Sequence, residues 1–107
     1  MEHLTPLELR PFLDQNPDAV VIDVRESWEH ELVRLPGARL IPLKTLPAVA
    51  AAEFPNREQA VVFHCHHGVR SMRACEFLEG QGYTRLYNLT GGIARYAAEV
   101  DPALPQY

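Results

Sequence analysis

The chain has 107 residues, of which 47% are hydrophobic and 22% charged, and its formal net charge is −4. This composition is typical of one compact domain spanning residues 1–107, and it argues against a disordered or fibrous protein. The ten Lys and Arg residues are scattered along the chain, which argues against a surface for nucleic acid or an anionic membrane.

The opening residues, Met1 to Pro6, lack the basic and apolar segments of a secretory leader. No stretch approaches the roughly 18 apolar residues that a membrane span needs, so we expect a cytoplasmic protein. The only cysteines, Cys65 and Cys75, do not form a C-x-x-C motif. In a reducing compartment this pattern points away from a structural disulfide. Each cysteine therefore needs its own explanation.

Helix and strand signals alternate along the first part of the chain. Thr5-Pro6-Leu7-Glu8 is a capping box with proline at the first helical position, and it predicts a helix that stops at Asn16-Pro17. The run Ala19–Ile22 is apolar and bounded by turn residues, which predicts a strand buried on both faces. A polar, helical turn follows over residues 28–31. Arg39–Ile41 predicts a short strand that ends at proline.

The same alternation continues to the end of the chain. Thr45 is expected to cap the next helix, and Ala60–Phe63 predicts the central strand. A helix beginning at Ser71, a strand over Leu86–Leu89 and a helix carrying residues 93–100 follow. Strands that alternate with helices predict an α/β fold with a parallel sheet, helices on both faces and right-handed crossovers.

Two segments that carry reactive or charged side chains follow predicted strands. Ligands of such sheets bind outside the carboxyl ends of the strands, where Asp23, Arg25 and Cys65 fall. Cys65 also precedes a helix, and amides at a helix amino terminus and nearby cations lower the pKa of a thiol. Gly68 lets the loop curl so that backbone amides point inward. Arg70 is a fixed cation, either for an anionic substrate or for a carboxylate that braces the loop.

The neighbouring cysteine and histidines allow simpler interpretations. Cys75 lies on the inward face of its predicted helix, where we expect a small buried hydrophobic residue. The four consecutive residues His64 to His67 cannot surround one metal ion as separated ligand pairs do, so we expect no metal site. His66 and His67 either tune the thiolate or are exposed residues without a role.

Four other side chains have less specific signals. Asp23 and Arg25 form either a pair that fixes the loop or substrate, which their location favours, or solvated charges at a strand end. We expect Trp28 and Tyr96 to be packing residues rather than binding platforms.

Taken together, these motifs resemble the single-domain rhodaneses, a sulfurtransferase family. The resemblance covers nearly the whole chain and rests on the order and spacing of Asp23-Val24-Arg25-Glu26, Leu35-Pro36-Gly37-Ala38, Ile41-Pro42-Leu43, the Cys-x-x-Gly-x-Arg-Ser motif at Cys65 to Ser71, Gly82-Tyr83 and Leu89-Thr90-Gly91-Gly92-Ile93. It implies a rhodanese-like α/β fold with a five-stranded, mainly parallel sheet and helices on both faces.

The resemblance also implies a reaction and a set of site residues. Cys65 would take sulfane sulfur from thiosulfate or a persulfide and pass it to a thiol, cyanide or a sulfur-carrier protein, without a cofactor. The implied active-site loop and its supporting residues are Cys65, His66, His67, Gly68, Val69, Arg70, Ser71, Asp23 and Arg25. Two departures from the family pattern, Val33-Arg34 in place of Gly-His and Tyr96 in place of tryptophan, affect local packing and the rim of the site.

Three rival interpretations remain open. Cell-cycle phosphatases share the rhodanese-like fold, but their loop has five residues between cysteine and arginine, whereas four separate Cys65 from Arg70. The domain can instead be a relay or interaction module that a partner protein loads with sulfur. Finally, Cys65 can be a redox sensor that forms a sulfenic acid or mixed disulfide.

Overall fold

Five strands form one sheet with the spatial order β1-β5-β4-β2-β3. The computed structural model describes residues 1–107, and every neighbouring pair of strands in it is parallel. The strands are β1 (Glu2–Leu4), β2 (Val20–Asp23), β3 (Arg39–Leu40), β4 (Val61–His64) and β5 (Leu86–Leu89). The predicted α/β architecture with a five-stranded parallel sheet is therefore confirmed.

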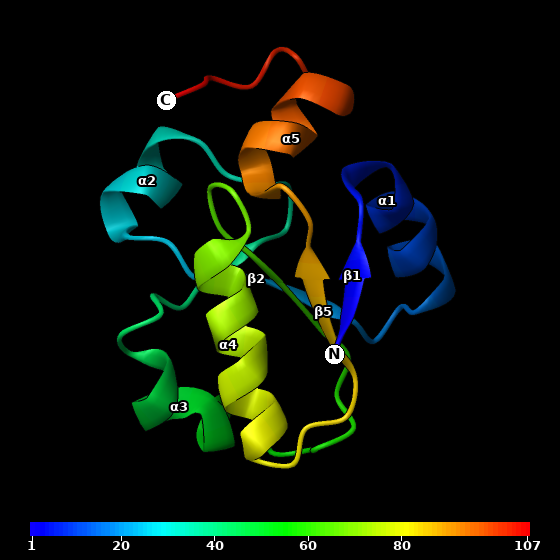
Figure 1. The fold of residues 1–107 in the computed structure, drawn as a ribbon, viewed down its shortest axis with the longest axis vertical. Helices are drawn as coiled ribbons and strands as arrows, with labels where there is room; N and C mark the ends of the chain where they lie inside the picture. The colour runs from blue at the N-terminus through cyan, green and yellow to red at the C-terminus, as the bar shows by residue number, and fades with distance from the viewer.

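Helices lie on both faces of this sheet, as expected (Figure 1). The helices are α1 (Pro6–Gln15), α2 (Ser27–Leu32), α3 (Leu46–Glu53), α4 (Val69–Gly80) and α5 (Gly92–Glu99), and all but α2 cover a face. At the start of α1 the Thr5 amide donates to Oε1 of Glu8 over 2.8 Å, which is one of the two bonds of the predicted capping box. None of the helices combines the length and apolar character that crossing a membrane requires.

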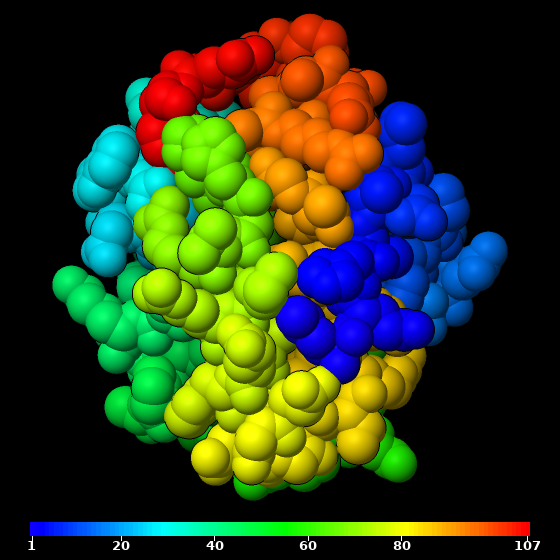
Figure 2. Space-filling model, viewed as in Figure 1, coloured from blue at the N-terminus to red at the C-terminus, as the bar shows by residue number.

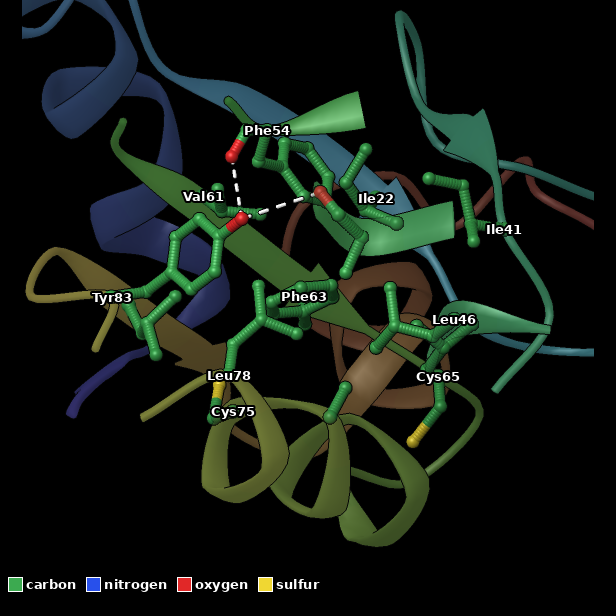
Figure 3. Close-up of a cluster of buried hydrophobic side chains, with 14 residues drawn as sticks. Ile22, Ile41, Leu46, Phe54, Val61, Phe63, Cys65, Cys75, Leu78 and Tyr83 are labelled. Carbon is green, nitrogen blue, oxygen red and sulfur yellow. Dashed lines mark hydrogen bonds between the residues drawn. The ribbon is translucent and has the colours of Figure 1, made fainter. Parts of the chain in front are cut away.

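Alternating side chains of the strands build two hydrophobic cores. Ile22 and Phe63 point to the face covered by α3 and α4, whereas Val21 and Val62 point to the face covered by α1 and α5. In the first core the hydroxyl of Tyr83 donates to a main-chain carbonyl at the end of α3 (Figure 3). Since both of their faces are buried, β2 and β4 are largely apolar runs, which is why the sequence predicted them.

Three details differ from the sequence-based expectations. The strand Glu2–Leu4 was not predicted from its residues, because it is short and its first two residues are exposed at a sheet edge. Helix α4 begins at Val69 rather than at Ser71, since Gly68 acts as its N-cap. Thr45 precedes α3, but no side-chain capping bond forms, because its hydroxyl donates to the carbonyl of Pro42 instead.

The sheet order brings the two candidate segments together. Strands β2 and β4 are neighbours, and Asp23 is paired in register with His64. The residues that follow each strand therefore leave the sheet side by side at its carboxyl edge. In Figure 1 the loop from β4 to α4 lies at this edge, together with α2 and α5.

Candidate active site

Cys65 lies in the loop between β4 and α4 with its sulfur turned into the loop. The residue is 1% exposed. Its Sγ accepts hydrogen bonds from the amide of Gly68 over 3.1 Å and from the amide of Ser71 over 3.4 Å. Gly68 adopts a φ of 104°, a left-handed conformation that a residue with a Cβ rarely takes. Backbone amides at the amino terminus of α4 therefore hold the sulfur in place.

Helix α5 holds the opposite side of the loop. The amide of Ile93 donates to the carbonyl of Cys65 over 2.9 Å, and the amide of Ala94 donates to the carbonyl of His66 over 3.1 Å. Gly92, with a φ of 62°, permits this approach, because a Cβ there would overlap both carbonyls. The amino terminus of α5 thus satisfies the loop carbonyls while loop amides face the sulfur.

A buried pair, Ser71 and Asn88, lies beneath the sulfur. The Ser71 hydroxyl is 3.4 Å from Sγ of Cys65 and donates to Oδ1 of Asn88. The side-chain amide of Asn88 in turn donates to the carbonyl of Gly68 over 3.4 Å. Asn88 was not predicted from the sequence, although a polar residue inside the buried strand β5 was a usable signal.

Arg70, which closes the loop, forms a bidentate ion pair with Glu29 of α2. Its terminal nitrogens lie 2.7 Å and 2.9 Å from the two carboxylate oxygens. Glu29 is only 3% exposed, and the bonds from Arg70 lower the pKa of its carboxyl to about 2. Of the two roles left open for Arg70, this geometry matches bracing of the loop. No sequence pattern singled out Glu29, because its partner lies 41 residues away.

We expect Glu29→Gln to weaken this brace in a pH-dependent way. Folding lowers the pKa of Glu29 from 4.5 to about 2, so the carboxylate stabilises the fold above about pH 4.5, and this stabilisation is lost as the pH falls toward 2. The substitution should lower the free energy of unfolding by about 2 to 3 kcal/mol near neutral pH. Urea unfolding at several pH values measures the difference.

The matched control is Glu31→Gln, which changes an exposed carboxylate on the same helix. Its effect should stay within about 0.5 kcal/mol at every pH. A difference between wild type and Glu29→Gln that is as large near pH 2 as at neutral pH would contradict the charged brace.

Asp23 and Arg25 form a buried pair below the loop, and both are 0% exposed. Nε and Nη2 of Arg25 donate to the two carboxylate oxygens of Asp23 over 2.9 Å and 2.8 Å. Nδ1 of His30 lies 2.8 Å from the same carboxylate. Burial alone would raise the pKa of Asp23, but the bonds from Arg25 together with His30 and His64 outweigh it and lower that pKa. The alternative of solvated charges is therefore wrong.

The histidines next to Cys65 point in different directions. His64 is fully buried beside Asp23 of the neighbouring strand, and its Nε2 has no hydrogen-bond partner. Burial lowers the pKa of His64 to about 4, so it is neutral at physiological pH. The rings of His66 and His67 stack on each other with centroids 4.0 Å apart. Val69 extends into solvent at 62% exposure.

The predictions for the remaining side chains are confirmed with one exception. Cys75 is buried, and desolvation raises the pKa of its thiol to about 12, as expected for a small core residue. Tyr96 packs against the second core. Trp28, however, is 60% exposed, because α2 lies at the end of the sheet rather than on a face, so its prediction as a packing residue was wrong.

The comparisons with known proteins place the chain in a family. A model of the family described as Rhodanese-like domain matches residues 5–99. The chain belongs to the rhodanese family. Among solved structures, the human single-domain sulfurtransferase TSTD1 superposes on this rhodanese domain with a TM-score of 0.76 and 28% identity, covering 91% of this chain and 96% of that one. The predicted resemblance is thus confirmed.

Curated relatives of this rhodanese domain carry different names. The probable adenylyltransferase/sulfurtransferase MoeZ of Mycobacterium tuberculosis is 32% identical over 97% of this chain and 26% of that protein. The tRNA uridine(34) hydroxylase of Citrobacter koseri is 32% identical over 90% of this chain and 28% of that protein. The chain therefore spans less than a third of these relatives. One of these names refers to sulfur transfer and the other to hydroxylation. The reaction of this chain therefore has to be argued from its own site.

Proposed function

We propose that this rhodanese domain is a sulfurtransferase whose Cys65 carries sulfane sulfur as a persulfide. The observation that carries the proposal is the setting of Sγ, which accepts bonds from the amides of Gly68 and Ser71 at the start of α4. Fixed amide donors and the helix dipole stabilise an anionic sulfur without a metal or a side-chain base. The neighbouring His64 is buried and neutral, which agrees with such a role for the backbone.

The reaction consists of two half-reactions. The Cys65 thiolate attacks the outer sulfur of thiosulfate, the sulfur–sulfur bond of the donor breaks, and sulfite leaves with the electron pair. Cys65 then carries a persulfide anion. An acceptor thiolate or cyanide attacks the terminal sulfur, and the Cys65 thiolate is released in its original state. This is the ping-pong logic of covalent catalysis.

The named relatives support the sulfurtransfer chemistry and suggest classes of partner. One relative is named a sulfurtransferase and another a single-domain sulfurtransferase. We therefore extend the proposal to a small anionic sulfur donor and to a thiol, cyanide or a sulfur-carrier protein as acceptor. A relay in which only a protein persulfide loads Cys65 is the second form of the same chemistry.

The position of Arg70 argues against phosphatase activity. Both terminal nitrogens of Arg70 donate to Glu29, which occupies the bidentate face that a phosphoryl group would need. Only four residues separate Cys65 from Arg70, so fewer backbone amides surround the sulfur than in the longer phosphatase loop. The site thus suits a single sulfur atom better than a tetrahedral phosphate.

Intact-mass measurement after incubation with thiosulfate tests the proposal. We expect the protein to gain the mass of one sulfur atom and to lose it when a reductant is added. Loading by a protein persulfide but not by thiosulfate would select the relay form. Hydrolysis of an aryl phosphate without sulfur loading would favour the phosphatase, and sulfenic acid formation at low peroxide without sulfur turnover would favour the redox sensor.

A further inference from the structure

Tyr107 is attached to the active-site loop through both its ring and its hydroxyl. The ring stacks on His66 with centroids 3.9 Å apart and an angle of 8° between the planes. The hydroxyl donates to Oε2 of Glu29 over 2.6 Å and accepts from Nη1 of Arg25 over 2.8 Å. In Figure 2 the red segment that ends at Tyr107 lies against the light-green loop and the cyan helix α2.

These contacts hold two residues of the loop that carries Cys65. His66 directly follows Cys65, and its ring is held by the ring of Tyr107. Arg70 closes the loop, and it is held by Glu29, which also accepts the Tyr107 hydroxyl. Tyr107 therefore restrains His66 directly and Arg70 through Glu29.

The protonation states support this arrangement. Burial raises the pKa of Tyr107 to about 12, so its hydroxyl keeps the proton that it donates. Burial also lowers the pKa of His66, which favours the neutral ring in the stack.

The surroundings show what this restraint controls. Because Cys65 is 1% exposed, a bulky donor reaches the sulfur only if the loop around it moves. A hollow of about 140 Å³ lies between the loop, α5 and the residues preceding Tyr107, and the rings of His66 and Tyr107 line it. This space gives the loop room to move once the stack between His66 and Tyr107 is released.

We propose that Tyr107 is a specificity-determining residue of the site: by holding His66 and Arg70, it keeps the loop around Cys65 closed to all but small sulfur donors. As a statement about sulfur donors this inference rests on the proposed function. As a statement about access to the thiol it is independent of that function, because a reagent that alkylates the buried Cys65 needs the same movement of the loop.

Alkylation of Cys65 measures access directly. Rates with iodoacetamide and with fluorescein maleimide are compared, and the modified residue is identified by peptide mass. In Tyr107→Ala we expect the ratio of maleimide to iodoacetamide rates to rise by about tenfold or more, since both restraints are lost. Tyr107→Phe keeps the stack but loses both hydroxyl bonds, and it should raise the ratio by about threefold.

Tyr87→Phe is the matched control, because Tyr87 packs on Phe12 of α1. It should leave the ratio at the wild-type value. Circular dichroism checks that each variant is folded, and Tyr107→Phe still decides the question if Tyr107→Ala does not fold. Wild-type ratios in the folded Tyr107 variants would overturn the inference.

The same variants are then loaded with sulfur from thiosulfate and from glutathione persulfide, with mass as the readout. We expect the rate with the bulky donor to rise relative to thiosulfate in both Tyr107 variants, and unchanged selectivity would refute the specificity role. If the wild-type protein accepts sulfur from no donor, the proposed function fails. The alkylation ratios then still decide whether Tyr107 controls access to Cys65.

Discussion

Cys65→Ser is expected to abolish sulfur transfer from thiosulfate to cyanide, with a loss of at least about 10³-fold. The serine hydroxyl is not ionised near neutral pH, and oxygen cannot replace the thiolate as the carrier of a sulfane sulfur. The amides of Gly68 and Ser71, which bond to the wild-type sulfur, would remain without their reacting partner. Thiocyanate formation measures the turnover, and intact mass measures the loading.

Cys75→Ser provides the control for this experiment. Cys75 is buried in the first core and lies apart from the loop (Figure 3). The variant should keep its sulfur-transfer rate while losing about 1 to 3 kcal/mol of stability, because a hydroxyl replaces an apolar contact in the core. Full activity in the Cys65→Ser protein would end the proposed mechanism.

Gly92→Ala should damage both the fold and the site. At a φ of 62° an added Cβ is strained, and it would overlap the main-chain carbonyls of Cys65 and His66. The strain costs about 1 to 2 kcal/mol and the overlap about 1 to 3 kcal/mol. Because α5 must then move away from the carbonyls that Ile93 and Ala94 bond, we expect the loop amides to turn from the sulfur and loading to fall by about 100-fold.

Gly37→Ala separates the effect of backbone strain from the effect of a Cβ that overlaps the loop carbonyls. Gly37 has a similar φ of 76°, but a Cβ there has no neighbour within 4 Å. This variant should lose about 1 to 2 kcal/mol in urea unfolding and still load sulfur at the wild-type rate. Equal loading rates in the two glycine variants would show that the contact between α5 and the loop is not needed for the reaction.

The sequence alone was sufficient for most of the architecture. Strands buried on both faces appear as apolar runs, and proline, glycine and capping residues mark where helices begin and end. Around Cys65 the order of strand, cysteine, glycine and arginine is local, so it could be read directly. The exception was β1, since its exposed residues at the sheet edge carry no apolar pattern.

Only the tertiary structure decided how the loop is held. Arg70 meets Glu29 across 41 residues, and Tyr107 reaches the same carboxylate across 78. Asn88 comes from β5, which the sheet order places beside β4. Local periodicity contains no information about such contacts, because they depend on which strand ends and helices the sheet brings to one edge. The cysteine proposed to react is thus visible in the chain itself, whereas most of the residues that hold its loop in position emerge only from the fold.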